Sequence, residues 1–190
     1  GSILIFISLI PLMIGDGIQY ILKISSRNLA MLIAIEACIY FSIFLYSFCK
    51  RKTNWCINTI VLIYITIFIS AGLHHVLNNA LLNYIGGFAM CLIFDYWLRK
   101  KYSDFLKVLN LILVALILLN FVTILVFPQG MYETALYKAN WILGYKNSHF
   151  GYVMAALASV TIQAYEKNKK LMFWNNAFFV VACVCLLYTS

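Results

Sequence analysis

Residues 105–126 read FLKVLNLILVALILLNFVTILV, and this stretch decides the fold because Lys107 is its single charged side chain. A hydrocarbon core about 30 Å thick needs about 20 helical residues to cross it. A soluble domain of 190 residues has too little interior to hide many stretches of this kind. The run therefore predicts a transmembrane helix.

The rest of the chain has the same apolar character. Of its residues 64% are hydrophobic and only 11% are charged, whereas a soluble domain is about 45–50% apolar and about 25% charged. This composition excludes disorder, a coiled coil and a cytosolic enzyme. It predicts an all-α, polytopic membrane protein with about seven transmembrane helices. Pro11 and Gly15-Asp16-Gly17 interrupt the first of them, and if that segment is interfacial the number is six. The seven expected spans are residues 3–22, 29–49, 54–73, 80–98, 105–126, 150–165 and 171–190.

Basic residues alternate between the connections and predict the orientation. Ten of the fourteen Lys and Arg residues fall on one side of the predicted membrane and four on the other. The positive-inside rule assigns the ten to the cytoplasm. Membrane topology therefore explains the excess of positive charge, and no nucleic-acid partner is expected. We expect a multi-pass plasma-membrane protein with a cytoplasmic N-terminus and a largest external loop at 127–149. Because the chain begins with Gly1 and ends with an apolar run, residues 1–190 are interpreted as one transmembrane domain, the N-terminal half of a longer protein.

Residues 127–149, FPQGMYETALYKANWILGYKNSH, are the candidate site because they are polar and rich in aromatic residues. Such aromatic residues also collect at head-group depth for purely structural reasons, and this interpretation stays open. Alternatively, the polar residues just before a helix could bind a phosphate or diphosphate, because free N–H groups and a positive dipole end lie there. A histidine beside a diphosphate could act as acid or base. The candidate binding residues are Tyr132, Asn140, Trp141, Tyr145, Lys146 and Asn147, and the candidate acid or base is His149.

Polar groups inside the expected spans form a second set of candidates. Glu36 has no cation nearby in the sequence, so it is protonated, pairs with another helix or lines a polar cavity. Asp95 precedes Arg99 by four residues, which predicts an ion pair on one helix. The side chains of Asn110, Asn120 and Gln163, with other Asn residues, are expected to form hydrogen bonds between helices. The adjacent His74 and His75 diverge around a helix and cannot chelate together, so no metal site is expected.

The loop resembles part of a known family. FPQGMYETALYKANWILGYKNSHFGYVM, residues 127–154, resembles the first conspicuous external loop of the O-antigen ligase/polymerase superfamily, in particular its Wzy-like repeat-unit polymerases of capsule and exopolysaccharide loci. Those proteins carry a phrase like F-P-x-G-M-Y and then N-W-x-L-G-Y-x-N-x-H leading into a helix. IFDYWLRKKY, residues 93–102, also resembles the family's cytoplasmic helix end. The matching loop residues are Phe127, Pro128, Gly130, Met131, Tyr132, Asn140, Trp141, Leu143, Gly144, Tyr145, Asn147 and His149.

The resemblance implies a membrane glycosyltransferase with a GT-C-like fold. Such an enzyme transfers glycan from undecaprenyl diphosphate to an acceptor outside the membrane, without a metal or other cofactor. Its expected partners are the undecaprenyl-diphosphate-linked oligosaccharide, membrane lipid and other polysaccharide-assembly proteins. In this family the essential arginines and histidine lie in a later external loop, so this chain is expected to lack the complete active site. Two alternatives remain: the membrane sensor module of a peptide-responsive histidine kinase, and a flippase for lipid-linked oligosaccharides.

Overall fold

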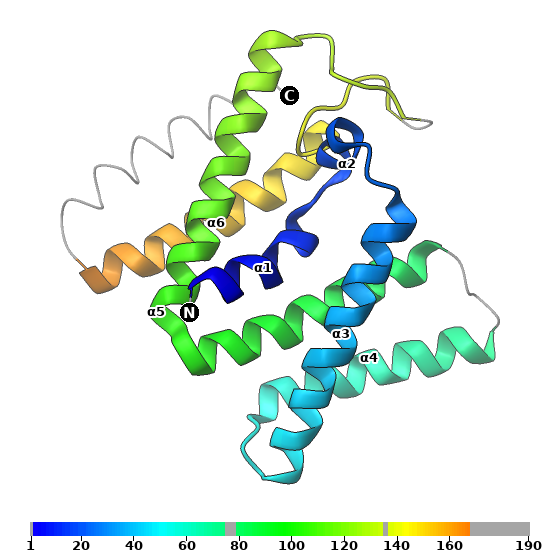
Figure 1. Cartoon of the computed structure of the whole chain (residues 1–190), viewed down its shortest axis with the longest axis vertical. Helices are drawn as coiled ribbons and strands as arrows, with labels where there is room; N and C mark the ends of the chain where they lie inside the picture. The colour runs from blue at the N-terminus through cyan, green and yellow to red at the C-terminus, as the bar shows by residue number, and fades with distance from the viewer. Residues whose placement is uncertain (1, 75–78, 135–136, 168–190) are drawn as a thin grey trace. The chain divides into compact units, whose positions relative to one another are not determined.

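The computed structural model describes residues 2–74, 79–134 and 137–167, and for residues 79–83, 146–148 and 164–167 it describes the backbone only. The described residues are mostly helical, as predicted (Figure 1). The expected span at 171–190 lies outside them. The helices are α1 (Ser2–Met13), α2 (Asp16–Leu22), α3 (Ser26–Cys49), α4 (Trp55–Leu73), α5 (Asn79–Val126) and α6 (Lys146–Lys167).

The apolar helices support a helical membrane protein. Within the described residues, α3, α4 and the Tyr84–Val126 part of α5 are each long and apolar enough to cross a membrane, and α1 with α2 could form a fourth span. The expected number of seven is therefore not established. Two expected spans, 80–98 and 105–126, lie in α5 on either side of a kink at Lys101, whose backbone angles are non-helical (φ −149°, ψ 57°), so α5 consists of two helices joined at this residue. The connection is shorter than expected because residues 99–104 contain no Gly or Pro to end the helix.

The predicted interruption of the first span is confirmed. Helix α1 ends at Met13 and α2 begins at Asp16, after Gly15, whose backbone is extended. Pro11 lies within α1, so the break falls at the glycine-rich segment and not at the proline. With 12 residues, α1 is about 18 Å long, which is too short to cross the hydrocarbon core alone.

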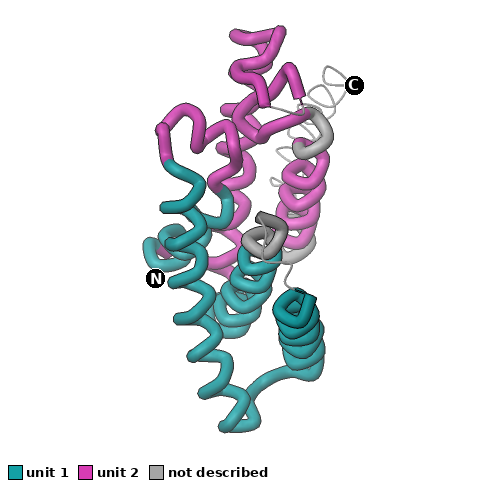
Figure 2. The backbone as a smooth tube through the Cα atoms, turned by 90° about the vertical axis from the view of Figure 1, so that its right-hand side faces the viewer, with its two compact units in different colours: residues 1, 3–13, 25–102 teal, residues 2, 14–24, 103–190 magenta. Residues whose placement is uncertain are grey.

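The chain divides into two compact units (Figure 2). Unit 1 contains residues 3–13 and 25–102, and unit 2 contains residues 14–24 and 103–190. The division within α5 falls next to the interruption at Lys101. Glu36 thus belongs to unit 1, whereas the loop at 127–149 belongs to unit 2.

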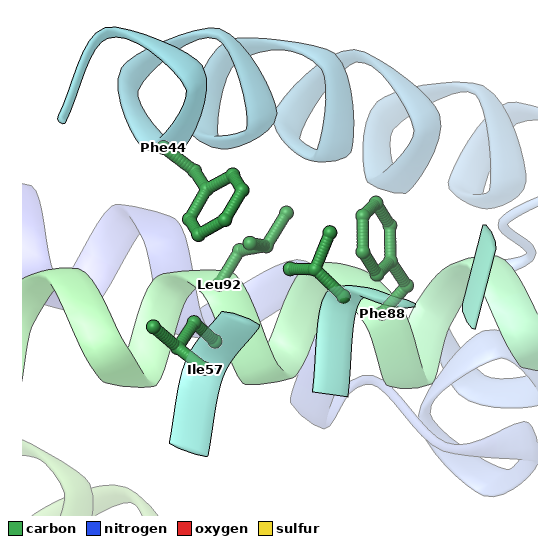
Figure 3. Packing of buried hydrophobic residues seen from close by; sticks show 5 residues of the cluster. Phe44, Ile57, Phe88 and Leu92 are labelled. Atoms are coloured by element: carbon green, nitrogen blue, oxygen red, sulfur yellow. The ribbon is translucent and has the colours of Figure 1, made fainter. Parts of the chain in front are cut away.

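The core of unit 1 joins α3, α4 and α5. Phe44 of α3, Ile57 of α4, and Phe88 and Leu92 of α5 are all buried in one apolar cluster (Figure 3). Nearby, a Cβ atom on Gly87 of α5 would lie 2.6 Å from the Tyr64 hydroxyl of α4. Large side chains therefore pack together in this cluster. Because Gly87 has no side chain, the Tyr64 hydroxyl can lie directly against α5.

Hydrogen bonds join α5 and α6 within unit 2. The hydroxyl of Ser159 donates to Asn110 Oδ1 at 3.4 Å, and Gln163 Nε2 donates to the carbonyl of Leu106 at 2.6 Å. Both contacts confirm the predicted role of Asn110 and Gln163 as polar groups between helices. These bonds hold α6, and with it the end of the loop at 127–149, against α5.

Candidate functional site

The loop at 127–149, which the sequence predicts to be external, folds as a narrow hairpin and not as an open coil. The N–H of Met131 donates to the carbonyl of Asn140 at 2.8 Å, and the N–H of Asn140 donates to the carbonyl of Tyr132 at 3.2 Å. Gly130 has φ +99°, and a Cβ atom there would lie 2.7 Å from Ala139 Cα. A glycine is therefore required at this position, where the two sides of the hairpin lie close together.

Asn140 and Trp141 use their side-chain N–H groups inside this hairpin. Asn140 is 2% exposed, and its Nδ2 donates to the carbonyls of Tyr132 at 3.2 Å and Tyr137 at 3.0 Å. Trp141 is buried, and its Nε1 donates to the carbonyl of Phe127 at 2.9 Å. Both residues hold the loop in shape, while their expected contact with substrate stays a prediction.

A tight turn ties the hairpin to α5. Trp141 and Gly144 exchange backbone hydrogen bonds of 3.0 and 2.9 Å, and Gly144 has φ +85°. Between them, the N–H of Leu143 donates to Asn120 Oδ1 at 3.0 Å. Within the described part of the chain, the Asn120 side chain therefore binds the loop backbone, whereas the sequence predicted a bond to another helix.

Helix α2 lies against the same turn. Gly17 of α2 is so close that a Cβ atom would lie 2.3 Å from the Trp141 carbonyl oxygen and 2.5 Å from Ile142 Cα. Tyr20, one turn further along α2, stacks on Tyr132 with ring centroids 4.9 Å apart. The loop and α2 thus form one platform, which we call the loop platform: residues 16–22, 127–134 and 137–145.

Tyr132 and Tyr145, both predicted binding residues, lie in stacked aromatic pairs. Tyr145 stacks on Tyr137 with centroids 3.8 Å apart, and Tyr132 stacks on Tyr20. Burial and the negative charge of Asp16 raise the pKa of Tyr132 to about 12. The Tyr132 hydroxyl is buried without a hydrogen-bond partner among the described residues, so it could bond to a ligand.

Asp16 and Tyr20 were missed by the sequence analysis. Asp16 is exposed and Tyr20 is 57% exposed, and their spacing of four places them on one face of α2. The polar Gly15-Asp16-Gly17 segment within an apolar run was the available signal, but it was interpreted only as an interruption. Its contact with the loop, more than a hundred residues away in sequence, had no local signal.

His149 is buried at the junction of the loop and α6. It is 2% exposed, lies 5.9 Å from the Trp141 ring between centroids, and its Nε2 is 3.2 Å from the Gly144 carbonyl oxygen. If Nε2 donates this bond, Nδ1 is the free acceptor, and Nδ1 has no partner among the described residues. Lys146 and Asn147 lie in the first turn of α6, and their side chains are outside the described part. Helix α6 thus begins four residues before the expected helix at 150.

Burial lowers the pKa of His149 below its usual value, while the hydrogen bond to Gly144 opposes this effect. The unfolded chain therefore binds a proton more readily than the folded loop. We expect the stabilisation from neutral His149 to be complete above about pH 6.5, the usual histidine pKa, and to be lost as the pH falls through the lower pKa of the folded state. Thermal unfolding midpoints between pH 8 and pH 5 measure this loss, and His149→Gln should flatten the profile. An identical pH profile in His149→Gln would contradict the prediction.

Glu36 belongs to a separate polar cluster in unit 1. Its Oε2 atom is buried without a partner among the described residues. One turn further along α3 lies Tyr40, and the single N–H of Trp97 Nε1 is shared between the Tyr40 hydroxyl and Ser8 Oγ, each at 3.0 Å. Polar groups from α1, α3 and α5 therefore meet here, which fits the expectation of a polar cavity without establishing one.

No group of three His, Cys, Asp or Glu side chains that could hold a metal ion occurs in the described part of the chain. Comparison with known proteins adds no family assignment: no family model, no curated protein and no solved structure matches the chain. The resemblance of the loop to the polymerase family therefore depends on the residues quoted above.

Proposed function

We propose that this chain is the membrane part of a surface-polysaccharide polymerase or ligase with a GT-C-like fold. The enzyme would transfer glycan from undecaprenyl diphosphate to an acceptor at the outer face of the plasma membrane. The observation that carries the proposal is that the loop resembling this family is a fixed hairpin, packed on α2 at Gly17 and joined to α5 at Asn120. Such a platform can position a long, flexible substrate at low entropic cost.

The start of α6 is the proposed site for the diphosphate. Lys146 is the first residue of this 22-residue helix, so the free N–H groups of its first turn lie beside a cationic residue. Charge builds up on the diphosphate as it leaves the sugar, and fixed donors at this position stabilise that charge. Asn147 would add a further donor in the same turn.

The exposed face of α2 is the proposed site for the sugar. The Tyr20 ring, which is 57% exposed, offers an aromatic surface for stacking. Its partner Tyr132 holds that ring in place, and the buried Tyr132 hydroxyl, which has no partner among the described residues, would reach a sugar only if substrate binding uncovers it. The carboxylate of Asp16, which is exposed on the same face, can accept hydrogen bonds from sugar hydroxyls. These groups explain how the platform would distinguish a glycan from a plain lipid tail.

His149 is the proposed base. Its neutral Nδ1 would take the proton of the acceptor hydroxyl, whose oxygen forms the new bond to the sugar carbon while the bond from that carbon to the diphosphate oxygen breaks. In the structure this nitrogen is buried. Binding of substrate must therefore open the contact between the loop and α6 before the transfer.

Glu36 favours one alternative, a flippase for lipid-linked oligosaccharides. A half-buried carboxyl group in α3, whose Oε2 atom is buried without a partner among the described residues, is the kind of group that lines a substrate or ion pathway. Under the transferase proposal, replacing Glu36 by Gln should leave glycan transfer intact. Under the flippase alternative, that change should block lipid-linked substrate from reaching the outer leaflet.

Replacing Lys146 by Gln in the full-length protein, expressed in cells that make the polysaccharide, tests the proposal. Removing one donor from the site of developing charge lowers transfer by about 100-fold or more, so the polysaccharide ladder on a gel should shorten or disappear. Lys138→Gln is the matched control, because Lys138 is an exposed cation on the same loop but outside the proposed diphosphate site. An unchanged Lys146→Gln ladder at normal protein levels would refute the role of Lys146.

A further inference from the structure

Six basic residues gather at one end of α3 and α4 in unit 1. We call them the basic patch: three lie in the turn between α3 and α4, and three lie in α5 where the helix is interrupted. All six are exposed. The patch consists of Lys50, Arg51, Lys52, Arg99, Lys100 and Lys101.

The turn between α3 and α4 does not need its basic side chains to form. Backbone N–H groups of Lys50, Arg51 and Lys52 donate to carbonyls near the end of α3 at 3.2, 2.9 and 2.9 Å. Arg51 adopts the left-handed conformation (φ 53°), which closes the turn. Since the backbone satisfies the end of α3, the three cationic side chains are free for another role.

One hydrogen bond joins the two halves of the patch. Arg99 Nη1 donates to the carbonyl oxygen of Lys52 at 2.7 Å, so the α5 cations are held beside the turn. Arg99 also forms the predicted ion pair with Asp95. This carboxylate balances one of the six positive charges.

The remaining charges have no carboxylate partner among the described residues. The ammonium of Lys50 lies 5.3 Å from the centroid of the Tyr46 ring. The ammonium of Lys100 donates to the Tyr96 hydroxyl at 2.6 Å. These contacts orient the two cations without neutralising them, so the patch keeps a strong positive field.

The patch lies at the depth expected for lipid head groups. It joins the ends of α3 and α4, both long and apolar enough to cross a membrane. Trp55, the first residue of α4, is 79% exposed, and Tyr46 near the end of α3 is 66% exposed. Exposed Trp and Tyr at the ends of apolar helices are typical of the membrane–water interface, where lipid phosphates also lie.

We propose that the basic patch binds the head group of an anionic phospholipid, with its phosphate between the α3–α4 turn and residues 99–101. Each basic residue near a membrane surface adds attraction for anionic lipid, and five of the six here lack a carboxylate partner among the described residues. This site is independent of the loop platform and of the proposed transferase activity. The lipid would hold the turn and α5 together as a counter-ion shared by both.

Titrating the purified full chain in detergent micelles with phosphatidylglycerol or phosphatidylcholine tests the proposal, with bound lipid counted by native mass spectrometry. Phosphatidylglycerol should bind in preference. The triple variant Lys50→Gln, Arg51→Gln, Lys52→Gln should weaken its binding by about a hundredfold. The matched control removes three cations elsewhere, through Lys23→Gln, Arg27→Gln and Lys138→Gln, and should bind as the wild type does.

Three results would overturn the proposal. One is equal binding of the two lipids, and another is equal weakening in both triple variants. The third is full competition by millimolar inorganic phosphate, which would indicate a site for the free anion.

Should the triple variant not fold, Lys52→Gln and Lys101→Gln allow the same comparison, because neither ammonium group has a hydrogen bond or ion pair among the described residues. Each single change should weaken phosphatidylglycerol binding by about fivefold.

Discussion

Replacing Gly17 by Ala should detach the loop at 127–149 from α2. The new Cβ atom would lie 2.3 Å from the Trp141 carbonyl oxygen and 2.5 Å from Ile142 Cα. Both are backbone atoms of a turn that Asn120 and Gly144 hold in place, so no flexible side chain can move aside. We expect a destabilisation of about 3 kcal/mol, at the upper end for overpacking, and opening of the turn about a hundredfold more often.

Amide hydrogen exchange of the peptide covering residues 141–144 measures this opening directly. Gly151→Ala is the matched control, because nothing lies within 4 Å of the corresponding Cβ position in α6. Alanine is favoured over glycine in a helix by about 1 kcal/mol, so Gly151→Ala should keep the turn protected. Unchanged exchange in Gly17→Ala would show that α2 does not lie against the loop.

Local patterns in the sequence predicted a large part of this structure. Hydropathy predicted the apolar helices, and the glycines at positions 15 and 17 predicted the break in the first span. The spacing of Asp95 and Arg99 predicted their ion pair. Each of these features depends on residues within one or two turns of each other, where spacing alone determines which side chains meet.

Contacts between distant segments could not be predicted in the same way. Asn120 needed a hydrogen-bond partner inside an apolar helix, but its sequence neighbours do not indicate that the partner is the N–H of Leu143. Likewise, a glycine in α2 gives no sign that the backbone of Ile142 will lie against it. The sequence thus predicted the loop as a site and named residues in it, but not the α2 residues that complete the loop platform.

Replacing Trp141 by Ala should have the second large effect. The side chain is 7% exposed, lies edge-on to His149 and donates a hydrogen bond to the carbonyl of Phe127. Truncating a buried tryptophan costs about 3–5 kcal/mol, so the free energy of unfolding, measured by titration with a denaturing detergent, should fall by that amount. Trp55→Ala removes the same side chain from a site that is 79% exposed and should change the free energy by less than about 1 kcal/mol.

Trp141→Phe separates the two contributions of Trp141. Phenylalanine keeps an aromatic ring against His149 but leaves the Phe127 carbonyl without its indole donor, which costs about 1 kcal/mol. The expected order of destabilisation is therefore Trp141→Ala, then Trp141→Phe, then Trp55→Ala. If Trp141→Ala and Trp55→Ala were equally mild, Trp141 would face a solvent or lipid phase, and the loop would be the interfacial segment that its aromatic composition also allows. If the expected order holds, the hairpin is a folded platform, and the loss of transfer in Trp141→Ala should follow its loss of stability.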